Sequence, residues 1–271
     1  MLKDITLGQF FPGDTVAHRL DPRTKILLVV LYIVALFCAK SLLAYGILAA
    51  VLAVCVRISR VGIKSLVRGL KPVVFIIVFT GILNLFFTPG EHILAELGFL
   101  RISAEGLQNA VFMVLRIMLL IMGTFLMTYT TSPISLTDGL ERLLGGLKKI
   151  HVPVHELAMM MSIALRFIPL LIEETDKIMS AQRARGADFE SGNLIQRAKA
   201  LVPLLVPLFI SAFRRADELA IAMECRCYHG GEGRTRLKQL KFTAEDTRCA
   251  VIITAALLVI CATRFFVPGL A

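Results

Sequence analysis

The chain has 271 residues, of which 56% are hydrophobic and 18% are charged, and its formal net charge is +10. A soluble domain rarely carries so large an apolar fraction, so this composition excludes an ordinary soluble protein and indicates an integral membrane protein. Nucleic-acid-binding proteins are also basic, but lysine and arginine cluster here beside apolar runs, as the positive-inside bias of membrane proteins requires. We therefore expect a lipid bilayer, and no nucleic acid, as a partner.

Residues 1–25 lack the apolar core of a signal peptide, so the first apolar run is expected to remain as a membrane span. Four apolar runs follow, at 26–39, 42–56, 73–87 and 107–129. A single helix across the first two would be about 46 Å long, which is too long for one crossing, so the Lys40-Ser41 break predicts a helical hairpin. Residues 26–130 are thus expected to form four transmembrane helices.

The connections between these runs give the expected orientation. The second connection is basic and contains Arg57, Arg60, Lys64, Arg68 and Lys71. The third contains Glu91 and Glu96, with Arg101 as its basic residue. Because basic loops stay in the cytoplasm, the second connection and the N-terminal segment are expected on that side. A fifth span at 250–266, within the C-terminal segment 249–271, would then end outside.

Residues 131–248 are expected to form a cytoplasmic domain of long amphipathic helices. Two stretches in it, 157–172 and 201–213, are apolar enough to cross a membrane, but crossings there would export a basic connection. That connection contains Lys177, Arg183, Arg185, Arg197 and Lys199. We therefore predict helices at or below the cytoplasmic interface, with two further true spans as the alternative. The fold class predicted for the whole chain is an all-α integral membrane protein with about five transmembrane helices.

Two arginine-centred triplets end the two long predicted helices: Ala184-Arg185-Gly186 and Cys225-Arg226-Cys227. An arginine in the last turn complements the helix dipole by about 0.3–1 kcal/mol, which explains either arginine alone as well as binding does. The small neighbours, however, leave each guanidinium free to form paired hydrogen bonds with a carboxylate or with backbone carbonyls. Two copies of this device favour docking on two similar sites of a partner.

Other polar groups are less informative. Cys225 and Cys227 with His229 have the chemistry of a soft-metal site, but no second ligand pair stands nearby, so no metal is predicted. Arg116 lies inside the fourth span, where pairing with a carbonyl or polar side chain is favoured over a transport role. The sequence has no G-x-x-x-x-G-K-[ST] loop and no catalytic pattern, so neither an enzyme nor a cofactor is expected.

Two functions of different classes remain. The chain is either a non-catalytic scaffold that transmits the work of a separate ATPase, or a stand-alone secondary transporter or channel with Arg116 and Asn84 in its path. A secondary transporter is expected to show inverted repeats with broken helices at matching positions. The predicted spans divide four to one around the 131–248 segment, without that symmetry, so the scaffold is favoured.

Seven short motifs follow one another along the chain: GQF at 8–10, PGD at 12–14, HRLDPRTK at 18–25, PVHEL at 153–157, RFIP at 166–169, AQRARGAD at 181–188 and AMECRCY at 222–228. Together they resemble the T component of energy-coupling factor (ECF) transporters, the EcfT or CbiQ-like family. The resemblance covers nearly the whole chain, and the order of the motifs makes it specific.

This resemblance implies the scaffold of an ATP-driven importer of vitamins or other micronutrients in the bacterial plasma membrane. In that family the T component joins two cytosolic ATP-binding-cassette (ABC) ATPases of the EcfA type to the S component, a membrane protein that binds the substrate. It implies that Arg185 and Arg226 each end a coupling helix and dock on one ATPase. One departure is the pair of cysteines around Arg226, where the family has Ala-Arg-Gly, because Cys227 caps a helix less freely than glycine does.

Overall fold

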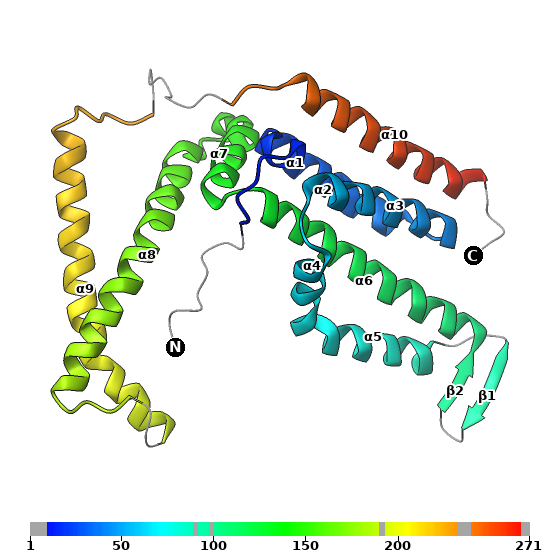
Figure 1. Cartoon of the computed structure of the whole chain (residues 1–271), viewed down its shortest axis with the longest axis horizontal. Coiled ribbons are helices and arrows are strands. Elements are labelled where there is room, and N and C mark those ends of the chain that lie inside the picture. The colour runs from blue at the N-terminus through cyan, green and yellow to red at the C-terminus, as the bar shows by residue number, and fades with distance from the viewer. Residues whose placement is uncertain (1–9, 89–91, 98–99, 190–192, 232–239, 267–271) are drawn as a thin grey trace. The chain divides into compact units, whose positions relative to one another are not determined.

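The computed structural model describes residues 10–88, 92–97, 100–189, 193–231 and 240–266 (Figure 1). The elements in chain order are α1 (Val16–Arg19), α2 (Pro22–Cys38), α3 (Leu42–Ser59), α4 (Ile63–Leu70), η2 (Lys71–Val73), α5 (Val74–Phe87), β1 (Ile93–Leu97), β2 (Leu100–Ser103), α6 (Ala104–Thr130), α7 (Pro133–Leu143), η3 (Leu144–Ile150), α8 (Val154–Ala184), α9 (Leu194–Glu224) and α10 (Ala244–Phe266). They form two compact units. The bundle unit holds the described residues up to Gly139 and from Leu240 onward, and the hairpin unit holds those between Leu140 and Gln239.

The first two long helices of the bundle unit are separated at the break that the sequence predicts. Asp21 caps α2 by accepting a hydrogen bond from the Arg23 amide, and Pro22 occupies the first helical turn. Ser41 caps α3 by accepting a hydrogen bond from the Ala44 amide. Each helix therefore begins at its own N-cap, and the chain reverses between them.

A short antiparallel hairpin joins α5 to α6 and was not part of the all-α expectation. Its strands pair Ile93 with Ser103 and Leu97 with Leu100. Ser103 then caps α6 by accepting a hydrogen bond from the Gly106 amide at 3.0 Å. Pairing across the hairpin satisfies backbone groups in a connection too short to show a strand period of its own. The rest of the fold confirms the helical membrane protein.

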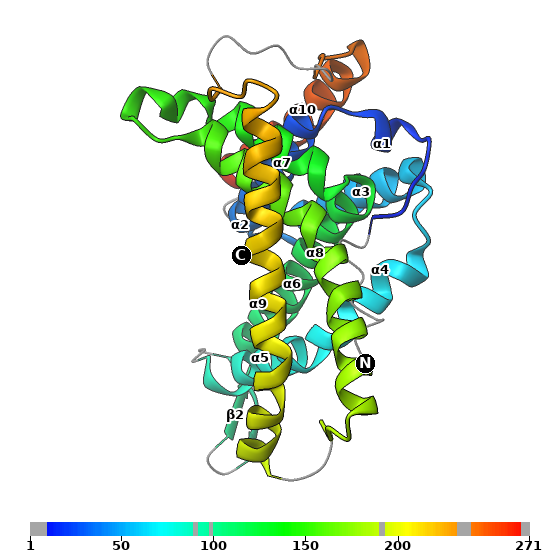
Figure 2. The ribbon, with the colours of Figure 1, turned by 90° about the vertical axis from the view of Figure 1, so that its left-hand side faces the viewer.

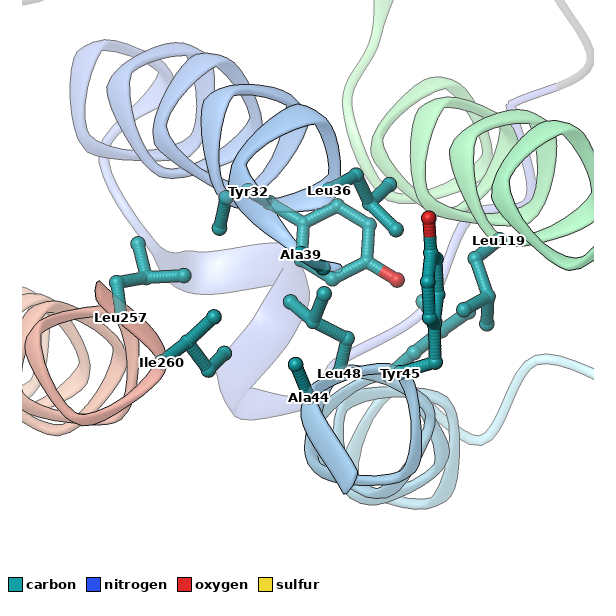
Figure 3. Close-up of a cluster of buried hydrophobic side chains, with 11 residues drawn as sticks. Tyr32, Leu36, Ala39, Ala44, Tyr45, Leu48, Leu119, Leu257 and Ile260 are labelled. Carbon is teal, nitrogen blue, oxygen red and sulfur yellow. The ribbon is translucent and has the colours of Figure 1, made fainter. Parts of the chain in front are cut away.

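The core of the bundle unit lies between α2, α3, α6 and α10 (Figure 3). Its buried members are Tyr32, Ala35, Leu36, Ala39, Ala44, Tyr45, Leu48, Leu52, Leu119, Leu257 and Ile260. Helices in lipid gain little from apolar burial, so close packing of small residues carries much of the association. Ala39 and Ala44 provide this closeness between α2 and α3, and a Cβ on Gly123 of α6 would overlap the Tyr32 ring.

A polar latch, made of Asp21, Arg23, Thr243 and Asp246, ties the start of α2 to the start of α10. Asp246 accepts hydrogen bonds from the Asp21 amide at 2.7 Å and from the Thr243 hydroxyl at 2.6 Å. Arg23 donates to the Leu240 carbonyl at 3.1 Å. Burial acts to raise the pKa of Asp246, but the hydrogen bonds from Thr243 and Asp21 outweigh it and hold that pKa below its ordinary value.

The hairpin unit is dominated by α8 and α9, each of 31 residues. At 1.5 Å per residue each helix is about 46 Å long. The two run antiparallel and lie side by side in both views (Figures 1 and 2). Pro203 and Pro207 lie inside α9, which bends along its length in Figure 1, as interior prolines cause.

Among the described residues, five stretches are long and apolar enough to cross a membrane: Leu42–Ser59, Ile63–Phe87, Ala104–Thr130, Val154–Ala184 and Ile195–Glu224. The first three contain predicted spans. The last two lie in α8 and α9, which we expect at the membrane interface. They belong to this set because length and composition do not distinguish an interfacial helix from a span. The other two predicted spans are absent from this set. The helix α2 has only 17 residues, and the run 250–266 extends past Ile260, the last α10 side chain described.

Candidate functional site

The C-terminal end of α8 is a Schellman turn that presents Arg185. The Ala187 amide donates to the Gln182 carbonyl at 3.0 Å, and the Gly186 amide donates to the Arg183 carbonyl at 3.0 Å. Gly186 has a φ of +87°, the left-handed conformation that closes this turn and that glycine adopts without a Cβ clash. All three residues of the first triplet are exposed.

The C-terminal end of α9 repeats this geometry around Arg226. The Tyr228 amide donates to the Met223 carbonyl at 3.0 Å, and the Cys227 amide donates to the Glu224 carbonyl at 2.8 Å. Cys227 stands where Gly186 stands in the first turn and has a φ of 53°. All three residues of the second triplet are also exposed. The likeness between the two triplets thus extends from their letters to their hydrogen bonds.

Arg185 and Arg226 occupy the same position, one residue before the left-handed residue of each turn. The helices α8 and α9 run antiparallel (Figure 2), and each arginine directly follows its helix, so the two arginines lie at opposite ends of the helix pair. A left-handed conformation costs an L-residue about 1–2 kcal/mol, so Cys227 carries backbone strain of that size in the second turn. The hairpin unit therefore carries two exposed guanidinium groups on matched supports.

An ion pair joins the two long helices between these ends. Glu174 of α8 accepts hydrogen bonds from Arg215 of α9 at 2.7 and 3.2 Å and from the Ser211 hydroxyl at 2.6 Å. Arginine and carboxylate in this two-bond geometry resist sliding better than a single contact does. The pair holds the register of α8 against α9.

A second polar contact lies where α9 ends beside the start of α8. His155 places Nδ1 2.9 Å from the Glu141 carboxylate of α7 and Nε2 3.5 Å from the Tyr228 hydroxyl. A Cβ on Gly231 would overlap the His155 ring, so the backbone there packs directly on the imidazole. Three chain segments meet at this side chain.

Arg116 of the bundle unit is held by α2 and α3. Its Nε donates to the Tyr45 hydroxyl at 3.0 Å, and its Nη2 donates to the Ala39 carbonyl at 3.4 Å. The guanidinium also lies 5.6 Å from the centre of the Phe37 ring. Asn84, the other residue of the channel hypothesis, donates to a carbonyl within its own helix α5.

The cysteines that flank Arg226 are free and exposed. Within the part of the chain that the structure describes, no group of three or more His, Cys, Asp or Glu side chains could hold a metal ion. That search included Cys225, Cys227 and His229.

Sequence reasoning missed the contacts of Glu174 and His155. Their partners Arg215 and Tyr228 are 41 and 73 residues away in sequence, so no helical spacing could indicate them. The latch aspartates are farther apart still. The one available signal was the place of His155 in the PVHEL motif.

Comparison with known proteins adds to this geometry. The family model described as cobalt transport protein, CbiQ, matches residues 13–237. The Energy-coupling factor transporter transmembrane protein EcfT of Thermosediminibacter oceani is 56% identical over 259 residues, which cover 96% of this chain and 97% of the relative. The protein of the same name from Clostridium kluyveri is 56% identical, with 93% and 95% covered. That of Bacillus subtilis is 49% identical, with 95% and 98% covered.

Proposed function

The chain belongs to the CbiQ family, as a membrane-embedded T component of energy-coupling factor transporters, and from this premise we propose that it couples two cytosolic ABC ATPases to an S component. The ATPases supply the work, the S component supplies the substrate site, and this chain transmits movement between them. The cargo is a vitamin or another micronutrient. The chain itself catalyses no reaction.

The observation that carries this proposal is the pair of matched arginine ends. Two turns with the same hydrogen-bond pattern, at opposite ends of one helix pair, suit two copies of one binding groove, as a pair of similar ATPases would offer. Each guanidinium is flanked by small residues and can enter a groove to bind a carboxylate or backbone carbonyls. A helix dipole accounts for a basic residue in a last turn but not for the shared turn geometry.

The long helices supply the mechanical link. When the ATPases close, a displacement at Arg185 or Arg226 is carried along about 46 Å of helix, and the Glu174–Arg215 pair makes α8 and α9 move as one body. We place residues 131–248 in the cytoplasm, with the apolar faces of these helices against the membrane interface and the S component. Seven large apolar side chains of α9 support this, because they are exposed in the isolated chain: Leu201, Val202, Leu205, Val206, Phe209, Ile210 and Phe213.

The test is retention of the ATPases by the complete complex purified from membranes. Losing one partner of a hydrogen-bonded charge pair costs about 2–5 kcal/mol, so Arg185→Ala and Arg226→Ala should each weaken retention, and the double variant should lose both ATPases and substrate uptake. Arg214→Ala, an exposed arginine in the interior of α9, is the matched control and should retain both ATPases and uptake. Full retention and uptake in the double variant would refute the assignment.

A further inference from the structure

His155 joins three segments of the hairpin unit that are far apart in sequence. It lies in the first turn of α8, contacts Glu141 of α7 through Nδ1, and contacts Tyr228 beyond α9 through Nε2. The His155 and Glu141 side chains are 21% and 12% exposed, so water competes weakly for their hydrogen bond. The Gly231 backbone closes the remaining side of the ring.

The two ring nitrogens of His155 can each form a hydrogen bond with one of these partners. In the neutral ring, Nδ1–H donates to the Glu141 carboxylate and Nε2 accepts from the Tyr228 hydroxyl. The two ring nitrogens thus join Glu141 to Tyr228, and the cluster of His155, Glu141, Tyr228 and Gly231 acts as a clamp.

The clamp holds Tyr228, the residue that closes the turn around Arg226. Tyr228 closes that turn through its amide and reaches His155 through its hydroxyl. Gly230, with a φ of +99°, and Gly231, with no room for a Cβ, then turn the backbone onto the start of α8. Arg226 thus sits at the tip of a helix whose last turn is fixed to α7 and α8.

We propose that His155 is a positioning residue for Arg226: through Glu141 and Tyr228 it fixes the direction in which that guanidinium meets its ATPase and passes the load at Arg226 to α7 and α8. The inference rests on the proposed function of the two arginines. It distinguishes the C-terminal ends of α8 and α9, because loss of His155 should weaken the contact at Arg226 and leave the contact at Arg185 unchanged.

A double-mutant cycle on the complete transporter complex tests this selectivity. His155→Ala should weaken retention of the ATPases about tenfold, as loss of a hydrogen bond to a charged group implies. In an Arg226→Ala background it should add little, whereas in an Arg185→Ala background it should act in full. Tyr228→Phe, which removes only the hydroxyl and keeps the ring, should repeat the pattern at a few-fold. His155→Gln keeps one donor and one acceptor and should restore part of the loss.

Matched controls separate the clamp from general damage. His229→Ala removes an exposed histidine one residue beyond Tyr228 and should have no effect. Gly231→Ala should reproduce His155→Ala, because its Cβ would displace the ring, whereas Gly145→Ala, which has open space around it, should not. Equal effects of His155→Ala and Tyr228→Phe in both arginine backgrounds would refute the inference and leave a contact needed only for folding. No effect of Arg226→Ala itself would instead refute the proposed function.

Discussion

Replacing Arg116 should separate a structural arginine from one in a transport path. Arg116→Leu removes the hydrogen bonds to the Tyr45 hydroxyl and the Ala39 carbonyl and the contact with the Phe37 ring. Tyr45 is 1% exposed, so no water replaces the lost donor. Hydrogen bonds between membrane helices contribute about 0.6–1.7 kcal/mol each, and a cation–π contact contributes about 0.5–2 kcal/mol. We expect a total destabilisation of about 2–3 kcal/mol.

Thermal unfolding of the purified protein in detergent measures this loss. One kcal/mol corresponds to about 2–4 °C for a chain of this size class, so Tm should fall by about 4–12 °C. In a cycle with Tyr45→Phe, the coupling energy should be about 1 kcal/mol. Gln108→Leu, an exposed polar residue of the same helix, is the control and should leave Tm unchanged. An unchanged Tm in Arg116→Leu, or zero coupling to Tyr45, would refute the structural role.

Two further predictions concern the exposed thiols and the latch. A membrane-impermeant maleimide should not label Cys225 or Cys227 in intact cells but should label both in inside-out vesicles, where docked ATPases should slow the reaction. Labelling of these cysteines from outside intact cells would overturn the cytoplasmic placement of residues 131–248. The pKa of Asp246 lies below its ordinary value of 3.8, so its stabilising effect is complete above about pH 4 and is lost as the pH falls through the lowered pKa. Tm measured against pH should therefore drop on the acid side, and Asp246→Asn should remove that part of the drop.

The helices themselves were largely predictable, because their signals are local. Ser41 stands directly before the apolar run at 42–56 and Ser103 four residues before the run at 107–129, and both cap helices in the structure. The arginine ends were also visible as letters, since small residues surround Arg185 and Arg226. Local patterns of this kind depend on residues within one or two turns.

The clamp at His155, the Glu174–Arg215 ion pair and the latch could not be predicted, because each depends on residues brought together by the fold. Asp21 and Asp246 lie 225 positions apart, and either aspartate alone is only a polar residue near a helix start. The likeness of the two turns was hidden for another reason. Cysteine does not signal the left-handed conformation that glycine signals, yet Cys227 adopts it.

Cys227 makes the turns that end α8 and α9 unequal in backbone strain, although they have the same hydrogen-bond pattern. The α8 end closes with a residue at ease in the left-handed region, whereas the α9 end must hold an L-residue there at a cost of about 1–2 kcal/mol. The clamp at His155 holds Tyr228, the residue that closes this strained turn, whereas glycine closes the α8 turn without strain. Under the proposed function, the same contact with an ATPase is thus supported at one end by the conformational freedom of glycine and at the other by the side chains of the clamp.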